Sequence, residues 1–288
     1  MGDYAIWQCR QCGSGCVRPL PSPEALAAFY QGFLTNLEAG QYPRYLAAAG
    51  RLFPHLGLRP RGRRLLDVGG GGGFFSKAFE ALGYGESTYV DLDPQSCEFA
   101  RKELGLARVL NCDALQVREH VPGGFDLIYC RHLIEHLRAP TLFLERMAAF
   151  LGSEGRLVAQ CPNGDSLEYL AYPRLLRGRR ERIQSSNGVG AWAVLLDMVR
   201  RGMLHGIDPP RHLWAITGRG LRRWAAGAGL ACRVYARPLW DLAYSPAYVP
   251  RGVGGFAQSL AGNLLFAPWR GGTHLVGIIG RSSGGKQA

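Results

Sequence analysis

The stretch that organises this sequence is LLDVGGGGGF, residues 65–74. Its apolar residues and Asp67 are typical of the end of a buried strand, and five consecutive glycines separate them from a helical pattern at 74–82. Glycine is needed where the backbone turns sharply and approaches a ligand closely, with its amide groups free to bind. We therefore predict a strand, a ligand-binding loop and a helix in direct succession.

Two common glycine loops do not match this stretch. A dinucleotide-binding loop requires glycine at the sixth position of G-x-G-x-x-G, where this sequence has Phe74 or Phe75. A phosphate-binding P-loop ends in Gly-Lys-Ser/Thr, which is absent here. The pattern that remains is Asp-x-Gly-x-Gly-x-Gly, formed by Asp67, Gly69, Gly71 and Gly73.

Short apolar runs alternate with helical patterns along most of the chain. We expect helices at 74–82, 94–104, 140–151 and 218–228. The expected strands are 64–68, 87–91, 109–111, 125–130, 155–161, 230–235 and 274–279. Such alternation predicts βαβ units around a parallel sheet. The expected fold class is therefore α/β, a Rossmann-like, seven-stranded, mostly parallel sheet with helices on both faces, with a small N-terminal subdomain and a lid insertion.

Changes in composition divide the chain into four expected segments. Residues 1–53 form an N-terminal cap that contains a Cys cluster and helical patterns, and residues 54–162 form the core with the glycine loop. Residues 163–216 are an Arg-rich lid insertion with an amphipathic helix near 191–203. Residues 217–288 complete the core, apart from an excursion at 238–270 that is rich in Pro, Gly and aromatic residues.

The chain of 288 residues carries a formal net charge of +12. Between residues 171 and 223 there are eleven Arg and three acidic residues, so much of the excess charge lies in one segment. An acidic or phosphorylated partner would explain this cluster, and so would the codon bias of a GC-rich genome. No run reaches the roughly 18 apolar residues of a membrane span, and no signal pattern is visible, so a cytoplasmic protein is expected.

Further motifs follow the glycine loop in a fixed order. They are YVDLD (89–93), NCDA (111–114), FDLIYCRHLIEHL (125–137), GRLV (155–158), CPN (161–163), PRHLW (210–214) and AGL (228–230). Together with the Asp-Gly pattern they resemble the class I S-adenosylmethionine-dependent methyltransferases. The resemblance is to the small-molecule branch, near the ubiquinone-biosynthesis-like or type 23 group, and it covers roughly residues 4–280.

The resemblance implies S-adenosylmethionine as the cofactor and a methyltransferase activity. It places Asp91, with Leu92, at the ribose hydroxyls, and a carboxylate suits this role because it can accept from two hydroxyls at once. The other cofactor-binding residues that it implies are Asp67, Gly69, Gly71, Gly73, Asp113, Ala114 and Cys130. Asp113 is expected near the adenine amino group.

The segment His132-Leu-Ile-Glu135-His136 formally matches an inverted zinc-protease motif, but it follows a strand in a methyltransferase-like series. Related quinone-biosynthesis O-methyltransferases have Glu-x-x-Glu-His at this position, which is a candidate site for a divalent ion. In this sequence His132 replaces the first Glu, which argues against such an ion here. Methyl transfer from a sulfonium requires alignment of the acceptor with the methyl group, and it often requires a base that removes a proton from the acceptor. We expect His132 to be that base without a metal, sharing a helical face with Glu135 and His136. His212 and His136 are the further candidates, and capping or packing is the alternative role of Glu135 and His136.

Cys9, Cys12 and Cys16 have half of the spacing of a zinc site. The resemblance matches them to the second half of a zinc ribbon, which has either decayed or is completed by Cys16 and a distant side chain. Zinc prefers four ligands, so three thiols are weak zinc candidates, and the alternative is a small subdomain that covers the substrate entrance. The remaining five cysteines are expected to be reduced thiols.

We expect a small-molecule acceptor. An RNA methyltransferase and an enzyme for a lipid-linked acceptor at an anionic membrane are the two alternatives, suggested by the basic segment. The Asn/Asp-Pro-Pro-Tyr/Phe motif of base methylation is absent after the fourth strand, where the sequence is Cys130-Arg131-His132. Nucleic acid is therefore the less favoured partner, and peripheral membrane contact stays open.

Overall fold

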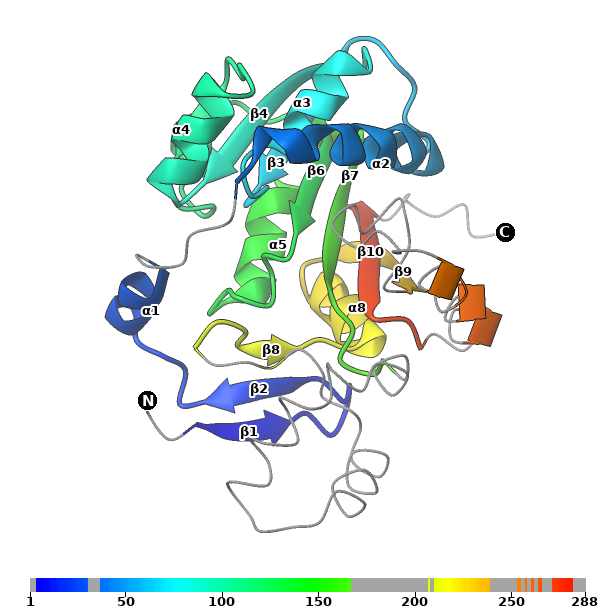
Figure 1. Ribbon diagram of the computed structural model, residues 1–288. Coiled ribbons are helices and arrows are strands. Elements are labelled where there is room, and N and C mark those ends of the chain that lie inside the picture. The colour runs from blue at the N-terminus through cyan, green and yellow to red at the C-terminus, as the bar shows by residue number, and fades with distance from the viewer. Residues whose placement is uncertain are drawn as a thin grey trace.

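The computed structural model describes residues 4–30, 37–166, 207, 210–238 and 271–281, with seven further residues between 253 and 265. The described part contains a seven-stranded sheet of order β5-β4-β3-β6-β7-β10-β9 (Figure 1). The parallel strands are β3 (Arg63–Val68), β4 (Gly85–Asp91), β5 (Val109–Asn111), β6 (Phe125–Arg131) and β7 (Leu151–Pro162). Two strands remain, and one of them, β10 (His274–Arg281), is antiparallel to both of its neighbours, β7 and the other remaining strand, β9 (Leu230–Arg237).

Helices cover both faces of this sheet. One face carries α2 (Tyr42–His55), α3 (Phe74–Ala81) and α4 (Pro94–Lys102), and the other carries α5 (Pro140–Ala148) and α8 (Gly218–Gly227). Successive strand residues alternate between the two faces, so Leu65 packs in the first core and Leu66 in the second. Two short 3₁₀ helices, η1 (Ala39–Gln41) and η2 (Val117–Glu119), lie in connections.

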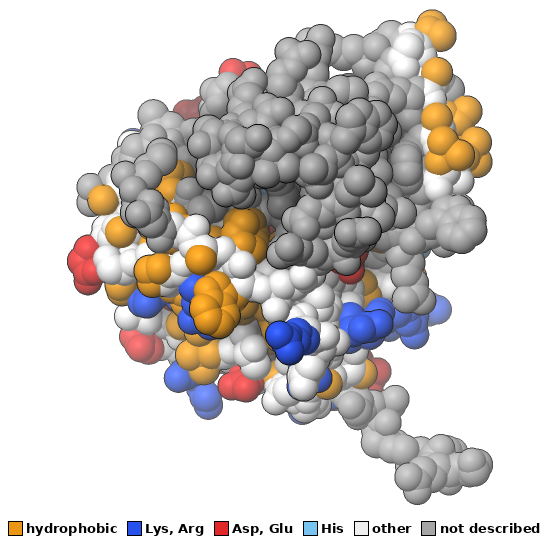
Figure 2. Space-filling view, turned by 90° about the horizontal axis from the view of Figure 1, so that it is seen from below, with side chains coloured by type: hydrophobic (Ala, Val, Ile, Leu, Met, Phe, Trp, Pro, Cys, Tyr) orange, Lys and Arg blue, Asp and Glu red, His pale blue; other side chains and the backbone are white. Residues whose placement is uncertain are grey.

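A second, smaller sheet joins distant parts of the chain. It contains β1 (Ala5–Gln8), β2 (Gly15–Arg18) and β8 (Trp214–Ala215), and α1 (Pro23–Tyr30) follows β2. The hydroxyl of Thr217 donates to the Cys12 carbonyl at 2.6 Å, which further ties the hairpin to the segment after β8. Viewed from below, the described surface shows hydrophobic side chains beside separate charged groups (Figure 2). The side chains of Ile6 and Trp7 in β1 are exposed.

The predicted fold is confirmed, with strand and helix ends that shift by a few residues. The expected end of the cap at residue 53 falls inside α2, where Leu52 and Phe53 are fully buried in the core of the large sheet. Most of the expected lid insertion at 163–216, its helix at 191–203, and most of the excursion at 238–270 lie outside the described residues. None of the described helices has the length and apolar composition that crossing a membrane requires.

Candidate active site

The candidate site lies where the parallel strands end. The carboxyl ends of β3, β4, β5 and β6 meet at one edge of the sheet, and the glycine loop follows β3. The strand β3 lies between β4 and β6, so the order of connections reverses beside it. Open α/β sheets bind their ligands at such a reversal, outside the carboxyl ends of the strands.

The glycine loop depends on the absence of side chains. Gly69, Gly71, Gly72 and Gly73 have φ angles of 66°, 53°, 92° and 79°, which L-residues with side chains rarely adopt. At Gly70, an added Cβ would lie 2.5 Å from Oδ1 of Asp67. The loop therefore lies directly over the Asp67 carboxylate, and main-chain groups rather than side chains face the sheet edge.

Asp67 is a buried carboxylate beneath this loop. It has no exposed surface, and the Ser76 hydroxyl donates to its Oδ2 at 2.9 Å. Its Oδ1 has no hydrogen-bond partner among the described residues. Burial raises the pKa of Asp67 to about 6, against the stabilising hydrogen bond from Ser76. The unpartnered oxygen leaves a buried acceptor at the base of the loop.

Asp91 is held in a fixed orientation at the end of β4. The Tyr89 hydroxyl donates to its Oδ2 at 2.9 Å, and the Asp93 amide donates to its Oδ1 at 3.0 Å. The amide of Gly72 donates in turn to the Tyr89 hydroxyl at 3.1 Å, which connects Asp91 to the glycine loop. Burial raises the pKa of Asp91. An ionised carboxylate has about four acceptor positions, so lone pairs remain for a ligand's hydroxyl groups.

The other expected cofactor residues divide into two groups. Leu92 and Asp113 are exposed at the sheet edge, Ala114 is half-buried, and the Leu115 amide donates to Oδ1 of Asp113 at 2.7 Å. The fourth residue, Cys130, has no exposed surface and packs in the core, where burial raises the pKa of its thiol. Its side chain therefore points away from the sheet edge, so the predicted contact of Cys130 with the cofactor would have to come from its main chain.

Sequence analysis did not single out Asn111, which connects two strand ends. Its side-chain amide donates to the main-chain carbonyls of Asp91 and Leu92, at 3.0 Å each. The contacts fix the loop that follows β4 against the end of β5. The sequence did contain a signal for this role, because Asn111 lies at a predicted strand end, directly before Cys112 and Asp113.

His132 lies just beyond β6 in a left-handed conformation, with φ of 52°. Its amide donates to the Gln160 carbonyl at 2.8 Å, and its Nδ1 lies 3.2 Å from Oε1 of Glu135. The predicted helical face is wrong, because residues 134–136 form a turn and α5 begins only at Pro140. Burial and the positive charge of Arg131 lower the pKa of His132 to about 3, so its imidazole is neutral at pH 7.

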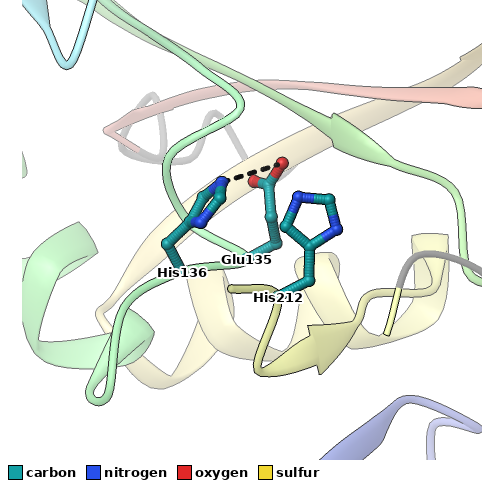
Figure 3. A group of neighbouring side chains, drawn as sticks. All are labelled: Glu135, His136 and His212. Atoms are coloured by element: carbon teal, nitrogen blue, oxygen red, sulfur yellow. Dashed lines mark ion pairs between the residues drawn. The ribbon is translucent and has the colours of Figure 1, made fainter. Parts of the chain in front are cut away.

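Glu135 is the centre of a cluster of imidazoles (Figure 3). Its side chain is 1% exposed, and Nε2 of His136 lies 3.8 Å from Oε1 of Glu135. The ring of His212 lies 4.7 Å from the ring of His136, between centroids. Glu135, His136 and His212 each offer a ligand atom within 4.8 Å of the others. Burial raises the pKa of Glu135, and its Oε2 has no hydrogen-bond partner among the described residues.

The contacts of His136 assign its tautomer. Its Nδ1 lies 3.0 Å from the Arg211 carbonyl, an acceptor only, so Nδ1 carries the hydrogen. The Tyr30 hydroxyl lies 2.7 Å from the same Nδ1 and accepts from it. In the neutral ring Nε2 then presents a lone pair toward the Glu135 carboxylate. A proton on Glu135, or a divalent cation between the two residues, would remove this repulsion.

The site thus differs in part from the expected one. His212 joins Glu135 and His136 because the Leu213 amide donates to the Glu135 carbonyl at 2.8 Å. His274, which sequence analysis did not single out, is buried with its ring 5.8 Å from that of His132. Within the described residues, the thiols of Cys9, Cys12 and Cys16 do not form a group with metal-ligand distances, and a zinc site there stays a prediction.

Known proteins share this sequence and this fold. A family model described as Methyltransferase domain matches residues 39–234. The mitochondrial ubiquinone biosynthesis O-methyltransferase of Schizosaccharomyces pombe is 34% identical over 102 residues, which cover 34% of this chain and 37% of that protein. The ubiquinone biosynthesis O-methyltransferase of Xanthomonas axonopodis pv. citri is 35% identical over 106 residues, 35% of this chain and 43% of that protein. The alignments thus span less than half of these relatives.

Two solved structures give the same result at the level of the fold. A SAM-dependent methyltransferase from Archaeoglobus fulgidus superposes with a TM-score of 0.50 and 18% identity, covering 82% of this chain and 93% of that one. The 1,6-didemethyltoxoflavin-N1-methyltransferase of Burkholderia thailandensis, solved with S-adenosylhomocysteine, gives 0.51 and 17%, covering 98% and 100%. The resemblance drawn from the ordered motifs is confirmed. The chain belongs to the methyltransferase domain family, and its fold is that of S-adenosylmethionine-dependent methyltransferases.

Proposed function

We propose that this chain uses S-adenosylmethionine to methylate a small molecule. The observation that carries the proposal is the left-handed glycine loop beside the fixed carboxylate of Asp91, at the point where the strand order reverses. These features fit the cofactor, because the left-handed glycine loop presents main-chain groups without side chains at the sheet edge, and Asp67 keeps an unpartnered oxygen below it. Family membership supports the same reading.

The residues at the sheet edge have distinct roles in this proposal. Asp91 would accept hydrogen bonds from the two ribose hydroxyls, and Asp113, which is exposed at the sheet edge, is assigned to the adenine amino group. The main-chain amides of the glycine loop would hold the cofactor. When bound, S-adenosylmethionine supplies a methyl group on a sulfonium, which is already an activated electrophile. The protein therefore has to align the acceptor and, for a hydroxyl, remove its proton.

His132 is the proposed proton acceptor. With Nδ1 directed at Glu135, Nε2 is the ring nitrogen that takes the acceptor's proton, and the resulting imidazolium is paired with the Glu135 side chain. With its pKa lowered to about 3 by burial and by the charge of Arg131, the His132 imidazole is a weak base, so the pair with Glu135 has to hold the proton. Glu135 is accordingly a positioning residue, which orients the ring and offsets its charge.

The acceptor is proposed to be a small molecule with a hydroxyl group, since the curated relatives are named O-methyltransferases. An acidic or phosphorylated acceptor would suit the basic segment at 171–223. All eight cysteines are unpaired, which supports a reducing compartment such as the cytoplasm. A lipid-linked acceptor or an RNA are outcomes that the experiment below distinguishes.

The proposal is tested by incubating the protein with S-adenosylmethionine carrying a deuterated methyl group and with fractionated metabolites, lipids or RNA. Mass spectrometry then follows the labelled methyl. We expect the label in a small, water-soluble product together with S-adenosylhomocysteine, and less label in that product with the Asp91→Ala variant when the cofactor concentration is below saturation. Label in the lipid or RNA fraction would reassign the acceptor. Tight cofactor binding with no labelled product from any fraction would contradict the proposed activity.

A further inference from the structure

Arg131, the last residue of β6, is a cation held in one position by two helices. Its Nη2 donates to the Tyr45 hydroxyl at 3.1 Å. Its guanidinium carbon lies 5.4 Å from the centroid of the Tyr45 ring and 5.7 Å from that of Phe75. Tyr45 is itself buried and stacks on Phe74 at 4.7 Å, and its ring lies 5.4 Å from that of Phe75, so residues of α2 and α3 hold the guanidinium together from one side.

The charge of Arg131 is not neutralised by an ion pair with any described residue. Burial opposes the charge, whereas Tyr45, Tyr129 and the negative charge of Asp67 raise the pKa of Arg131. The hydrogen bond to Tyr45 uses one of the five N–H donors of a guanidinium. Paired donors of this kind suit a carboxylate, which can accept two parallel hydrogen bonds.

The position of Arg131 is defined relative to the glycine loop. Cys130, the residue before it, pairs with Val68, the residue that immediately precedes Gly69. Asp67 pairs with Tyr129, so the side chains of Asp67, Tyr129 and Arg131 lie on the same face of the sheet. The cation is therefore beside the loop, on the β6 side of it.

The cofactor has an α-amino acid at one end and adenosine at the other. With Asp91 and Asp113 assigned to the adenosine at β4 and β5, the amino acid end extends across β3 toward β6, where Arg131 lies. We propose that Arg131 binds the α-carboxylate of the cofactor. The charge of Asp67 favours the α-ammonium group on the side of the glycine loop. This inference rests on the proposed function and specifies one residue of the same site.

The test compares two ligands that differ in the whole amino acid end, which carries the α-carboxylate. S-adenosylhomocysteine carries the α-amino acid, and 5′-methylthioadenosine lacks it while keeping the adenosine and the thioether. Calorimetric titration of the full chain gives the affinity ratio of the two. For the Arg131→Met variant we expect S-adenosylhomocysteine to bind about 10- to 100-fold more weakly and 5′-methylthioadenosine to bind as it does to wild type.

Two further variants make the comparison specific. Arg131→Lys keeps the charge without the paired donors, so it should lose part of the affinity for S-adenosylhomocysteine. Arg51→Met removes an exposed Arg from α2 and should change neither affinity. Where Arg131→Met fails to fold, the wild-type protein still tests the inference through the α-carboxamide of S-adenosylhomocysteine, which should bind about 10- to 100-fold more weakly than the acid.

Three results would overturn the inference. Equal weakening of both ligands by Arg131→Met would make Arg131 a residue that only supports the fold of the site. Unchanged binding of S-adenosylhomocysteine by Arg131→Met would show that the guanidinium does not bind the cofactor. An α-carboxamide that binds wild type as tightly as the acid would remove the carboxylate contact. By contrast, wild-type protein that binds neither nucleoside would contradict the proposed function itself.

Discussion

The Nδ1 atom of His132 lies 3.2 Å from Oε1 of Glu135, so the first side chain beyond β6 contacts a carboxyl group that is 1% exposed. Glu135 in turn faces His136, which contacts Tyr30 of α1 and the carbonyl of Arg211. A polar network thus extends from the edge of the large sheet to the N-terminal segment. The predictions below separate its proposed roles in proton transfer, metal binding and stability.

Replacement of His132 tests its role as proton acceptor. His132→Ala should lower turnover by about 10²–10⁴-fold, the range for loss of a general base, with unchanged affinity for S-adenosylhomocysteine. Glu135→Gln should lower turnover less and shift the pH profile, because it orients the ring but does not contact the acceptor. His120→Ala, at an exposed histidine in the loop before β6, is the matched control. Full activity of His132→Ala would remove His132 from the mechanism and leave His212 as the next candidate.

The cluster of Glu135, His136 and His212 allows a direct test of metal dependence. The proposed base mechanism needs no metal ion, so exhaustive chelation should leave turnover unchanged, and elemental analysis should find no bound divalent ion. Loss of activity on chelation, restored by one divalent metal and abolished in His212→Ala, would instead make these three residues a metal site.

Burial of His136 predicts a pH dependence of stability. Its pKa is lowered to about 4 in the folded protein, below the unfolded value of 6.5, so the unfolded state binds more protons between these two values. The free energy of unfolding should therefore fall as the pH decreases from 6.5 to 4. His136→Asn keeps a donor toward the Arg211 carbonyl without this titration, and should reduce the fall by at most about 3 kcal/mol.

The measurement is denaturant unfolding at a series of pH values for wild type, His136→Asn and a control, His120→Asn. Asp67 has the opposite effect on the free energy of unfolding, because its pKa is raised to about 6 in the folded protein. This contribution is common to all three proteins and cancels in the comparison. Identical pH profiles for wild type and His136→Asn would show that His136 is not buried as a neutral ring.

The contact between Gly70 and Asp67 predicts the effect of one methyl group. Gly70→Ala places a Cβ 2.5 Å from Oδ1 of Asp67, so the loop or the carboxylate has to move. We expect a loss of stability of about 1–3 kcal/mol and weaker binding of S-adenosylhomocysteine. Gly40→Ala, where an added Cβ meets nothing within 4 Å, should leave both unchanged. Equal behaviour of the two variants in thermal unfolding and calorimetry would contradict the close approach.

Local patterns in the sequence predict much of the fold and the cofactor side of the site. The glycine run and the acids at strand ends are signals that depend on a few neighbouring residues, and Asp67, Asp91 and Asp113 lie at the sheet edge as expected. The alternation of strand side chains also carried a signal that was missed. Cys130 is two residues after Ile128, so both point into the same core.

The acceptor side of the site depends on contacts between distant segments, which no local pattern gives. His212 reaches Glu135 because β8 pairs with β2 and the Leu213 amide binds the Glu135 carbonyl. The left-handed conformation of His132 ends the strand without starting a helix, so the predicted helical face of His132, Glu135 and His136 does not exist. Tyr30, Arg131 and His274 enter the site through such tertiary contacts.

The central claim is that the edge beside β3 and β4 binds S-adenosylmethionine. Calorimetric titration with S-adenosylhomocysteine tests it most directly, using wild type, Asp91→Ala and the exposed control Glu98→Ala from α4. The account predicts one site per chain in wild type, a loss of about 1–3 kcal/mol of binding free energy in Asp91→Ala, and no change in the control. Equal affinity of wild type and Asp91→Ala, or no binding to wild type, would contradict it.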